Sequence, residues 1–385
     1  MFDLRLDRRG LVLLGTVALL AGCKVIPKGP SDNPPPPPSP GPSDALPTDQ
    51  QRQRIALLVP LTGPNAAMGQ SIANATTMAL LDTNAKTIRI TTYDTAAGPA
   101  AAAGQALRDG NRLILGPLLS ADVPTVAAIA RSAKVPLITY AGEAEVAARD
   151  VFVLGTAPAN AIERVVAFAH SRGINRFALL APKGSYGARA TAAYSAAVKA
   201  VGGSLVSAQS YDHGNNSIVS AAGRLKAKGG FDAVLIADTG KYAAMAAPEL
   251  KRAGAAAPRI LGTELWSGEL VLSKTPALRG AWFPAISDAR FARFAESYRT
   301  RFGVAPFRIS TFGYDSVLLA VRIARDWRYG APFPVARLAD RDGFLGLDGA
   351  FRFGPMGLGE RALEVREARA GGVSIVSPAP DKFVD

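Results

Sequence analysis

Apolar and polar positions alternate along this chain in two different rhythms. Short runs that are apolar almost throughout, such as 54–61 and 112–118, are separated by longer alanine-rich segments with apolar residues every three or four positions. The short runs are typical of buried strands, and the longer segments are typical of amphipathic helices. Segment 123–134 is one such helix, and its predicted buried face holds Val123, Val126, Ala127 and Ala130. Buried strands separated by helices predict a parallel sheet that is covered on both faces.

The same alternation restarts after "VFVLGTAPAN" at 151–160. Four further strand candidates follow, at 176–182, 203–211, 231–238 and 259–265, with helical segments between them. We therefore predict two consecutive α/β lobes. At 385 residues the chain is long enough for two domains of ordinary size.

The last third of the chain departs from this alternation. Segment 290–303 predicts a helix whose apolar stripe packs in the core, and its members are Phe291, Phe294, Tyr298 and Phe302. A second helix is expected over 312–327. Segment 347–376 predicts antiparallel hairpin strands, because its short apolar runs are separated by glycine turns.

The first 23 residues predict a signal peptide that is removed from the fold. Arginines precede an apolar run of about thirteen residues, which is short for a membrane span. The run ends in "LLAGC", which resembles a lipobox, and its Cys23 is the only cysteine of the chain. We expect Cys23 to be lipidated; an ordinary buried thiol is the alternative. Arg8 and Arg9 leave both general secretion and twin-arginine export open.

Residues 24–51 predict a disordered tether. Pro34 to Pro38 are consecutive prolines, which favour extended polyproline II. At about 3.1 Å per residue, some 27 residues reach about 80 Å from the membrane. Lys24 follows the lipidated cysteine, and by resemblance to sorting signals of lipoproteins it indicates the outer membrane.

Composition excludes several functions. The formal net charge of +13 suits acidic surfaces such as lipid headgroups or wall polymers, but the Lys and Arg residues are not clustered with aromatics as in nucleic-acid binding. With two histidines and one cysteine, no His/Cys metal site is predicted, and no cofactor motif is present. "DTG" at 238–240 is a single copy, whereas an aspartic protease needs two carboxylates. We predict a binding protein and no enzyme.

The junction "LILGPLLSADVP" at 113–124 is the first candidate site. Ligands of open α/β sheets bind outside the carboxyl ends of strands, and a helix N-terminus there offers free N–H groups to an anion. Ser120 lies between such a strand and a helix that begins near Pro124. Ser120 and Asp122 have a second interpretation as simple caps of that helix.

Several stretches in order make the chain similar to the type 1 periplasmic binding proteins, in particular to the leucine/isoleucine/valine-binding solute receptors. They are 55–80, 113–142, 185–203, "ILGTELWSG" at 260–268, "FGYDSVLLA" at 312–320, and the glycine-bounded ending at 346–365. The resemblance implies two doubly wound parallel-sheet lobes joined by a three-crossover hinge. It places lobe 1 at 52–156 plus about 285–335, and lobe 2 at 157–284 plus about 336–385. "GTAPAN" at 155–160 and "GAWFPAI" at 280–286 match two of the crossings.

The resemblance also implies a ligand site between the lobes. In amino-acid-binding members the first lobe grips the α-carboxylate, which assigns Ser120 and Thr139, together with the backbone at Tyr140 and Ala141, to that group. The second lobe would close with Tyr186, Asp238 and Glu264, the glutamate holding the α-ammonium.

Two functions follow from the resemblance. The first is a lipid-anchored periplasmic receptor that captures a small, amino-acid-like ligand for an ABC transporter. The second belongs to a related branch that uses the same fold as an outer-membrane lipoprotein activating a penicillin-binding protein in peptidoglycan synthesis. The long tether, Lys24, and the unusual Leu118, Leu119 and Asp122 at the predicted carboxylate site favour the second.

Overall fold

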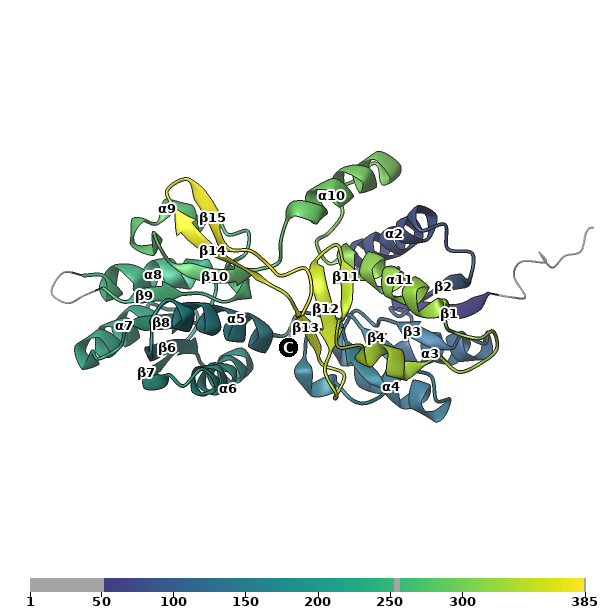
Figure 1. Cartoon of the computed structure of the whole chain (residues 1–385), viewed down its shortest axis with the longest axis horizontal. Coiled ribbons are helices and arrows are strands. Elements are labelled where there is room, and N and C mark those ends of the chain that lie inside the picture. The colour runs from purple at the N-terminus through teal and green to yellow at the C-terminus, as the bar shows by residue number, and fades with distance from the viewer. Residues whose placement is uncertain (1–51, 253–256, 384–385) are drawn as a thin grey trace, which may run out of the picture. The chain divides into compact units, whose positions relative to one another are not determined.

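A computed structural model describes residues 52–252 and 257–383 of the chain (Figure 1). The predicted signal peptide, Cys23 and the predicted tether lie outside these residues. No helix in the described ranges is both long and apolar enough to cross a membrane.

The first lobe is built on a five-stranded parallel sheet in the order β2-β1-β3-β4-β5. Its strands are β1 (Gln53–Val59), β2 (Ile88–Asp94), β3 (Leu113–Leu115), β4 (Leu137–Thr139) and β5 (Val151–Val153). The central strands are buried throughout, as their unbroken apolar runs predict. Each helix between them returns the chain to the starting edge of the sheet, so all five strands end at the same edge.

Four helices of at least ten residues cover this sheet among the described residues. They are α2 (Ala66–Asp82), α3 (Pro99–Arg108), α4 (Val123–Ser132) and α11 (Ser310–Ala324), and α10 (Ala289–Phe302) packs on the outside of α2 and α11. The predicted face of α4 is confirmed, because Val123, Val126, Ala127 and Ala130 are all buried. In α10 only Phe294 and Tyr298 are buried, while Phe291 and Phe302 are partly covered.

The second lobe contains a seven-stranded mixed sheet in the order β15-β14-β10-β9-β8-β6-β7. Strands β6 (Arg176–Pro182), β7 (Ser204–Tyr211), β8 (Ala233–Ile236), β9 (Arg259–Leu261) and β10 (Trp282–Ala285) are parallel, and β14 (Glu364–Arg369) and β15 (Gly372–Ser377) add an antiparallel hairpin. Its helices are α5 (Pro158–Ser171), α6 (Ser185–Ala200), α7 (Ser217–Lys228), α8 (Gly240–Leu250) and the short α9 (Val271–Lys274). The alternation of strands and helices predicted from the sequence is thus present in both lobes.

A small antiparallel sheet corrects the expected lobe boundary near residue 335. It comprises β11 (Phe344–Gly346), β12 (Gly349–Phe353) and β13 (Gly359–Arg361). Its phenylalanines share one apolar core with the strands of the first lobe, and Phe353 packs edge-on against Phe152 at 5.3 Å between ring centroids. Residues 344–361 therefore pack with the first lobe, and only the segment after them returns to the second.

The chain passes between the lobes three times. The connections lie between β5 and α5, between β10 and α10, and between β13 and β14. The first coincides with the "GTAPAN" stretch, whereas "GAWFPAI" contains strand β10 and reaches the second connection only at Ile286. At the first crossing Gly155 is required by close packing, because a Cβ there would meet the Ala141 carbonyl oxygen at 2.2 Å. This contact fixes the first connection against the end of β4.

Candidate functional site

The first-lobe residues predicted to bind a carboxylate lie at the carboxyl ends of β3 and β4. Ser120 begins the short 3-10 turn η1 (Ser120–Asp122) directly before α4. Its hydroxyl donates a hydrogen bond to the carboxylate of Glu143, which lies in the loop after β4. A ligand carboxylate at Ser120 would therefore meet a negative charge that already holds the hydroxyl.

Thr139 and Ala141 are also engaged within the lobe. The Thr139 hydroxyl donates to the Pro117 carbonyl over 2.9 Å and accepts the Ala141 backbone N–H over 3.1 Å. The Tyr140 N–H donates to the same Pro117 carbonyl over 3.1 Å. The Thr139 hydroxyl and the Tyr140 N–H thus join the ends of β3 and β4, and the Ala141 N–H is bound to Thr139.

The Tyr140 side chain points into the core of the first lobe. Its hydroxyl lies 2.9 Å from the Ser316 hydroxyl, and its ring lies 6.1 Å from that of Phe312. Burial raises the pKa of the Tyr140 phenol above its usual range. Asp122 adds a second carboxyl group to this junction. Its partial burial raises its pKa. The junction is acidic and has its predicted donors occupied.

The second-lobe residues form one connected cluster at the opposite carboxyl edge. Tyr186 lies in the first turn of α6, and its hydroxyl donates to Glu264 Oε1 over 3.1 Å, with Thr263 Oγ1 at 3.2 Å. Glu264 begins the 3-10 turn η3 (Glu264–Trp266) after β9. Burial raises the pKa of Glu264, and its Oε2 atom is buried without a hydrogen-bond partner.

Asp238 follows β8 and holds together the ends of two strands. Its Oδ2 accepts hydrogen bonds from the Tyr211 hydroxyl and from His213 Nε2, each over 2.5 Å. Burial and the Asp238 carboxylate raise the pKa of the Tyr211 phenol. Trp266 Nε1 donates to the Asp238 carbonyl over 2.8 Å, which ties Asp238 to the turn that carries Glu264.

Sequence reasoning missed Tyr211 and His213 as members of this cluster. The His213 ring also stacks on Tyr242 at 4.8 Å between centroids. A signal was present, because Tyr211 ends strand β7 and His213 follows it, and β7 ends at the same edge as the strand before Asp238. The carboxylate of Asp238 thus already has neighbouring donors, and a ligand would have to displace one of them.

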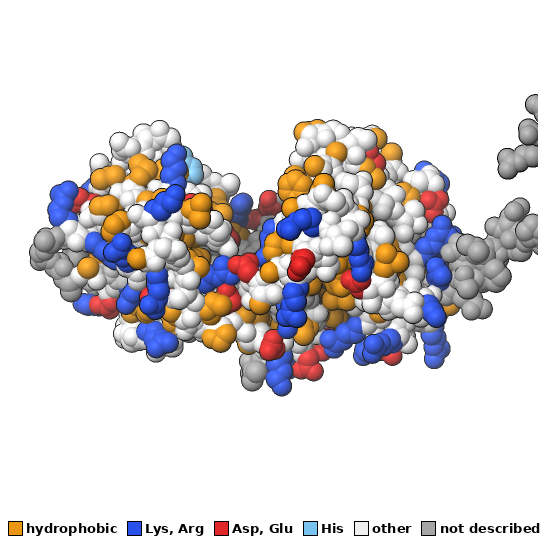
Figure 2. Space-filling view, turned by 90° about the horizontal axis from the view of Figure 1, so that it is seen from above, with side chains coloured by type: hydrophobic (Ala, Val, Ile, Leu, Met, Phe, Trp, Pro, Cys, Tyr) orange, Lys and Arg blue, Asp and Glu red, His pale blue; other side chains and the backbone are white. Residues whose placement is uncertain are grey.

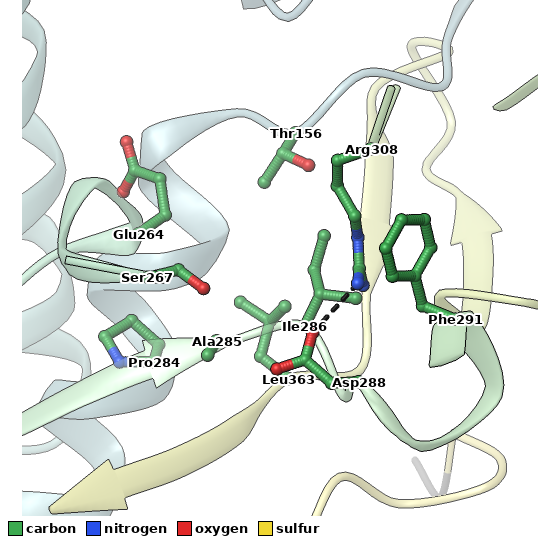
Figure 3. A pocket seen from close by; sticks show the side chains of 11 residues that line it. Thr156, Glu264, Ser267, Pro284, Ala285, Ile286, Asp288, Phe291, Arg308 and Leu363 are labelled. Atoms are coloured by element: carbon green, nitrogen blue, oxygen red, sulfur yellow. Dashed lines mark hydrogen bonds and ion pairs between the residues drawn. The ribbon is translucent and has the colours of Figure 1, made fainter. Parts of the chain in front are cut away.

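A cavity of about 460 Å³ lies where the three connections meet (Figure 3). Thr156 comes from the first connection and Leu363 from the third. Strand β10 contributes Pro284 and Ala285, and the second connection contributes Ile286 and Asp288. The remaining lining residues are Glu264, Ser267, Gly268, Phe291 and Arg308. Of the residues predicted as ligand contacts, Glu264 is the one that lines this cavity. Its size suits a small organic ligand.

The only cation in the cavity lining, Arg308, is already neutralised. Its guanidinium binds Asp288 over 2.8 Å and Asp348 over 2.9 Å, and it lies 4.2 Å from the centre of the Phe291 ring. Figure 3 shows Arg308 and Asp288 facing each other at one side of the cavity, with Glu264 on the opposite side. The cavity therefore offers apolar surface and a carboxylate acceptor, and it is poorly suited to a second anion.

Two α/β lobes joined by three connections, with a ligand-sized cavity at the connections, define the class of two-lobed binding proteins. The chain belongs to the periplasmic binding protein family, whose model matches residues 52–341. Membership of this family implies an extracytoplasmic location.

Individual relatives are distant. An uncharacterized protein of Rickettsia prowazekii is 29% identical over 140 residues, and this match spans 36% of the chain and 38% of the relative. Among solved structures, a protein of Rhodospirillum rubrum assigned to a branched-chain amino acid ABC transporter has a TM-score of 0.74 at 20% identity, covering 84% of this chain and all of that one. Full-length LpoA of Haemophilus influenzae has a TM-score of 0.67 at 17% identity, and the match covers 86% of this chain and 59% of LpoA. These likenesses show the type 1 periplasmic binding protein fold.

Proposed function

We propose that the chain is a non-enzymatic, lipid-anchored periplasmic protein that activates a penicillin-binding protein in peptidoglycan synthesis. The observation that carries this proposal is the engagement of Ser120, Thr139 and Ala141 in hydrogen bonds within the first lobe. A receptor for free amino acids needs unengaged donors for the α-carboxylate. A protein that acts on a partner through its surface does not need them.

The predicted tether supports the same function. A lipidated Cys23 in the outer membrane, followed by about 27 extended residues, lets the two lobes reach about 80 Å toward a synthase. A receptor that delivers its ligand to an inner-membrane transporter gains nothing from such an anchor. The two lobes would then serve as a rigid body that contacts the enzyme.

Reconstituted peptidoglycan synthesis tests this proposal. We expect the mature protein to bind a bifunctional glycosyltransferase/transpeptidase in a pull-down and to raise its rate of glycan polymerisation on lipid-linked precursor. Ser120→Ala is the matched control, and it should activate as well as the unmodified chain. Absence of both binding and activation, with every such synthase of the source organism, would contradict the proposal.

A second candidate is the transport receptor, and one observation favours it. Glu264 Oε2 is buried without a partner in a residue that lines the 460 Å³ cavity. An ammonium or amide group on a largely apolar, amino-acid-like ligand would supply the missing donor. Such a ligand should raise the Tm of the unmodified chain but not that of Glu264→Ala. Glu249→Ala is the control and should keep the Tm rise, because Glu249 pairs with Arg252 away from the cavity. No Tm shift with amino acids, amines or muropeptides excludes this candidate.

A further inference from the structure

The end of the first lobe at which its strands begin carries a cluster of basic side chains. Arg54 of β1 pairs in register with Arg89 of β2, so their side chains leave the sheet on the same face. The Arg112 N–H donates to the Arg54 carbonyl over 2.9 Å, which brings a third arginine alongside them at the start of β3. All three side chains are exposed.

Other elements extend this cluster. Lys134 lies between α4 and the start of β4, and the Gln53 side-chain amide donates to the Trp327 carbonyl over 2.9 Å, so the turn after α11 lies beside the start of β1. We call this surface the basic pole, and its exposed members are Arg54, Lys86, Arg89, Arg112, Lys134, Arg325 and Arg328. Figure 2 shows Lys and Arg side chains along this end of the lobe, at the right of the view.

The carboxylates near the pole are already bound by neighbours. Asp150 pairs with Arg131 over 2.6 Å, and Asp326 pairs with Arg337 over 2.5 Å. Asp109 accepts hydrogen bonds from the neutral Tyr93 and Gln105 and lies beside Arg54 and Arg89, so it offsets part of their charge. The excess positive charge of the pole therefore rests on Lys86, Arg112, Lys134, Arg325 and Arg328.

Helix dipoles explain part of the clustering of basic residues at this end of the lobe, but they do not explain what the basic pole does. Basic residues are favoured at helix C-termini, and in both lobes the helices end at the edge where the strands begin. The second lobe accordingly has Lys199 and Lys228 at the ends of α6 and α7. The basic end of the first lobe differs from that of the second lobe in one respect. The predicted tether joins the fold at the first lobe, at residue 52 directly before β1. Tyr329, 59% exposed, adds to the basic pole the kind of side chain that suits a membrane interface.

We propose that the basic pole docks on the anionic phospholipid surface of the membrane that carries the lipid anchor. This inference rests on the proposed anchoring of Cys23. Lys and Arg side chains near an anionic surface are attracted to it, and the attraction is screened beyond a Debye length. Docking would hold the first lobe at the membrane, and release would let the tether extend toward a partner.

Energy transfer in vesicles tests the docking. The mature protein is purified from membranes, its lipidation at Cys23 is verified by mass spectrometry, and it is reconstituted in phosphatidylcholine vesicles with or without 30% phosphatidylglycerol. Because the chain has no second cysteine, Ser132→Cys at the end of α4 accepts one donor dye, and the vesicles carry an acceptor lipid. Ala227→Cys near the end of α7 gives the corresponding label on the second lobe.

We expect strong transfer from position 132 in anionic vesicles, weak transfer in neutral ones, and loss of the difference in 0.5 M salt. Lys86→Glu with Arg112→Glu and Arg328→Glu should lower the ratio of docked to undocked protein at least tenfold. The matched triple Lys199→Glu, Arg224→Glu and Lys228→Glu changes the charge equally on the second lobe and should leave transfer from position 132 unchanged.

Three results would overturn the docking. The first is equal energy transfer in neutral and anionic vesicles, and the second is an equal effect of the two triple variants on that transfer. The third is loss of transfer in anionic vesicles when wall sacculi are added, which would show that the basic pole binds the wall polymer instead. If the triple variant of Lys86, Arg112 and Arg328 fails to fold, the dependence of energy transfer on lipid charge and on salt, measured for the unmodified chain, is the test. Missing lipidation refutes the anchor, whereas an anchored protein without transfer refutes the docking.

Discussion

The Ser120 hydroxyl donates its hydrogen bond to the carboxylate of Glu143, four residues after the end of β4. This pair occupies the position at which an amino-acid receptor of this fold is expected to hold a ligand carboxylate. Asp122 lies in the same turn, so two carboxylates share the junction. The junction thus places two carboxyl groups where the prediction expects donors for a ligand carboxylate.

Ser120→Ala is expected to lower the free energy of unfolding by about 1 kcal/mol, because it removes a partly exposed hydrogen bond to a charged group. It should leave the thermal response to free amino acids unchanged, since the serine serves Glu143. Urea unfolding and thermal shift measure the two effects. Ser132→Ala, which removes a hydroxyl bonded to the neutral Ile129 carbonyl, is the control and should cost less. A ligand-induced Tm rise that disappears in Ser120→Ala would show that the serine binds ligand.

Tyr211→Phe is expected to cost about 1.5–3 kcal/mol of stability, because the phenol bonds a carboxylate that is itself buried. His213→Ala should cost less than about 1 kcal/mol, since its side chain is 54% exposed and water can replace it. Denaturant unfolding of both variants checks the order. A larger loss for His213→Ala would mean that the imidazole, and not the phenol, holds Asp238 in place.

The sequence was sufficient to predict the architecture of each lobe because its signals are local. Buried strands need unbroken apolar runs, and helices need apolar residues every three or four positions, as in α4. The position of residues 344–361 has no such signal. It depends on Phe353 packing against Phe152, a contact between segments two hundred residues apart that only the folded chain creates.

The site was predictable in place but not in side-chain direction. Strand ends locate Ser120, Thr139 and Asp238 correctly at carboxyl edges. The Thr139 hydroxyl and the Tyr140 backbone N–H were expected to face a ligand, but both donate to the Pro117 carbonyl. Which donor a hydroxyl or carboxylate meets depends on loops such as 141–147, whose path is not encoded in a local pattern.

Arg308 should be coupled more strongly to Asp348 than to Asp288, although the two distances are almost equal. The Asp348 side chain is 2% exposed and the Asp288 side chain is 60% exposed, so water screens only the second pair. Double-mutant cycles with Arg308→Met and each Asp→Asn change give the two coupling energies from urea unfolding. We expect about 2–3 kcal/mol for Asp348 and less than about 1 kcal/mol for Asp288. Equal couplings would show that burial does not set the strength of these pairs.

Asp315 should make the stability of the first lobe fall as pH rises. Burial, together with repulsion from Asp348, raises the pKa of this carboxyl to about 7, although Arg361 lies 3.5 Å away and acts in the opposite direction. The folded chain therefore holds the proton more tightly than the unfolded chain, and the stability gained from the neutral acid is complete below about pH 4 and is lost as pH rises through 7.

Asp315→Asn removes this dependence, because the amide stays neutral at every pH. We measure the free energy of unfolding of Asp315→Asn and of the unmodified chain in urea at pH 4.5 and at pH 8. The value of the variant minus that of the unmodified chain should be a few kcal/mol larger at pH 8 than at pH 4.5. Asp340→Asn, at an exposed pair with Arg322, is the control and should show no such trend. A difference between Asp315→Asn and the unmodified chain that stays constant from pH 4.5 to pH 8 would mean that Asp315 is ionised throughout, with Arg361 as its full counter-charge.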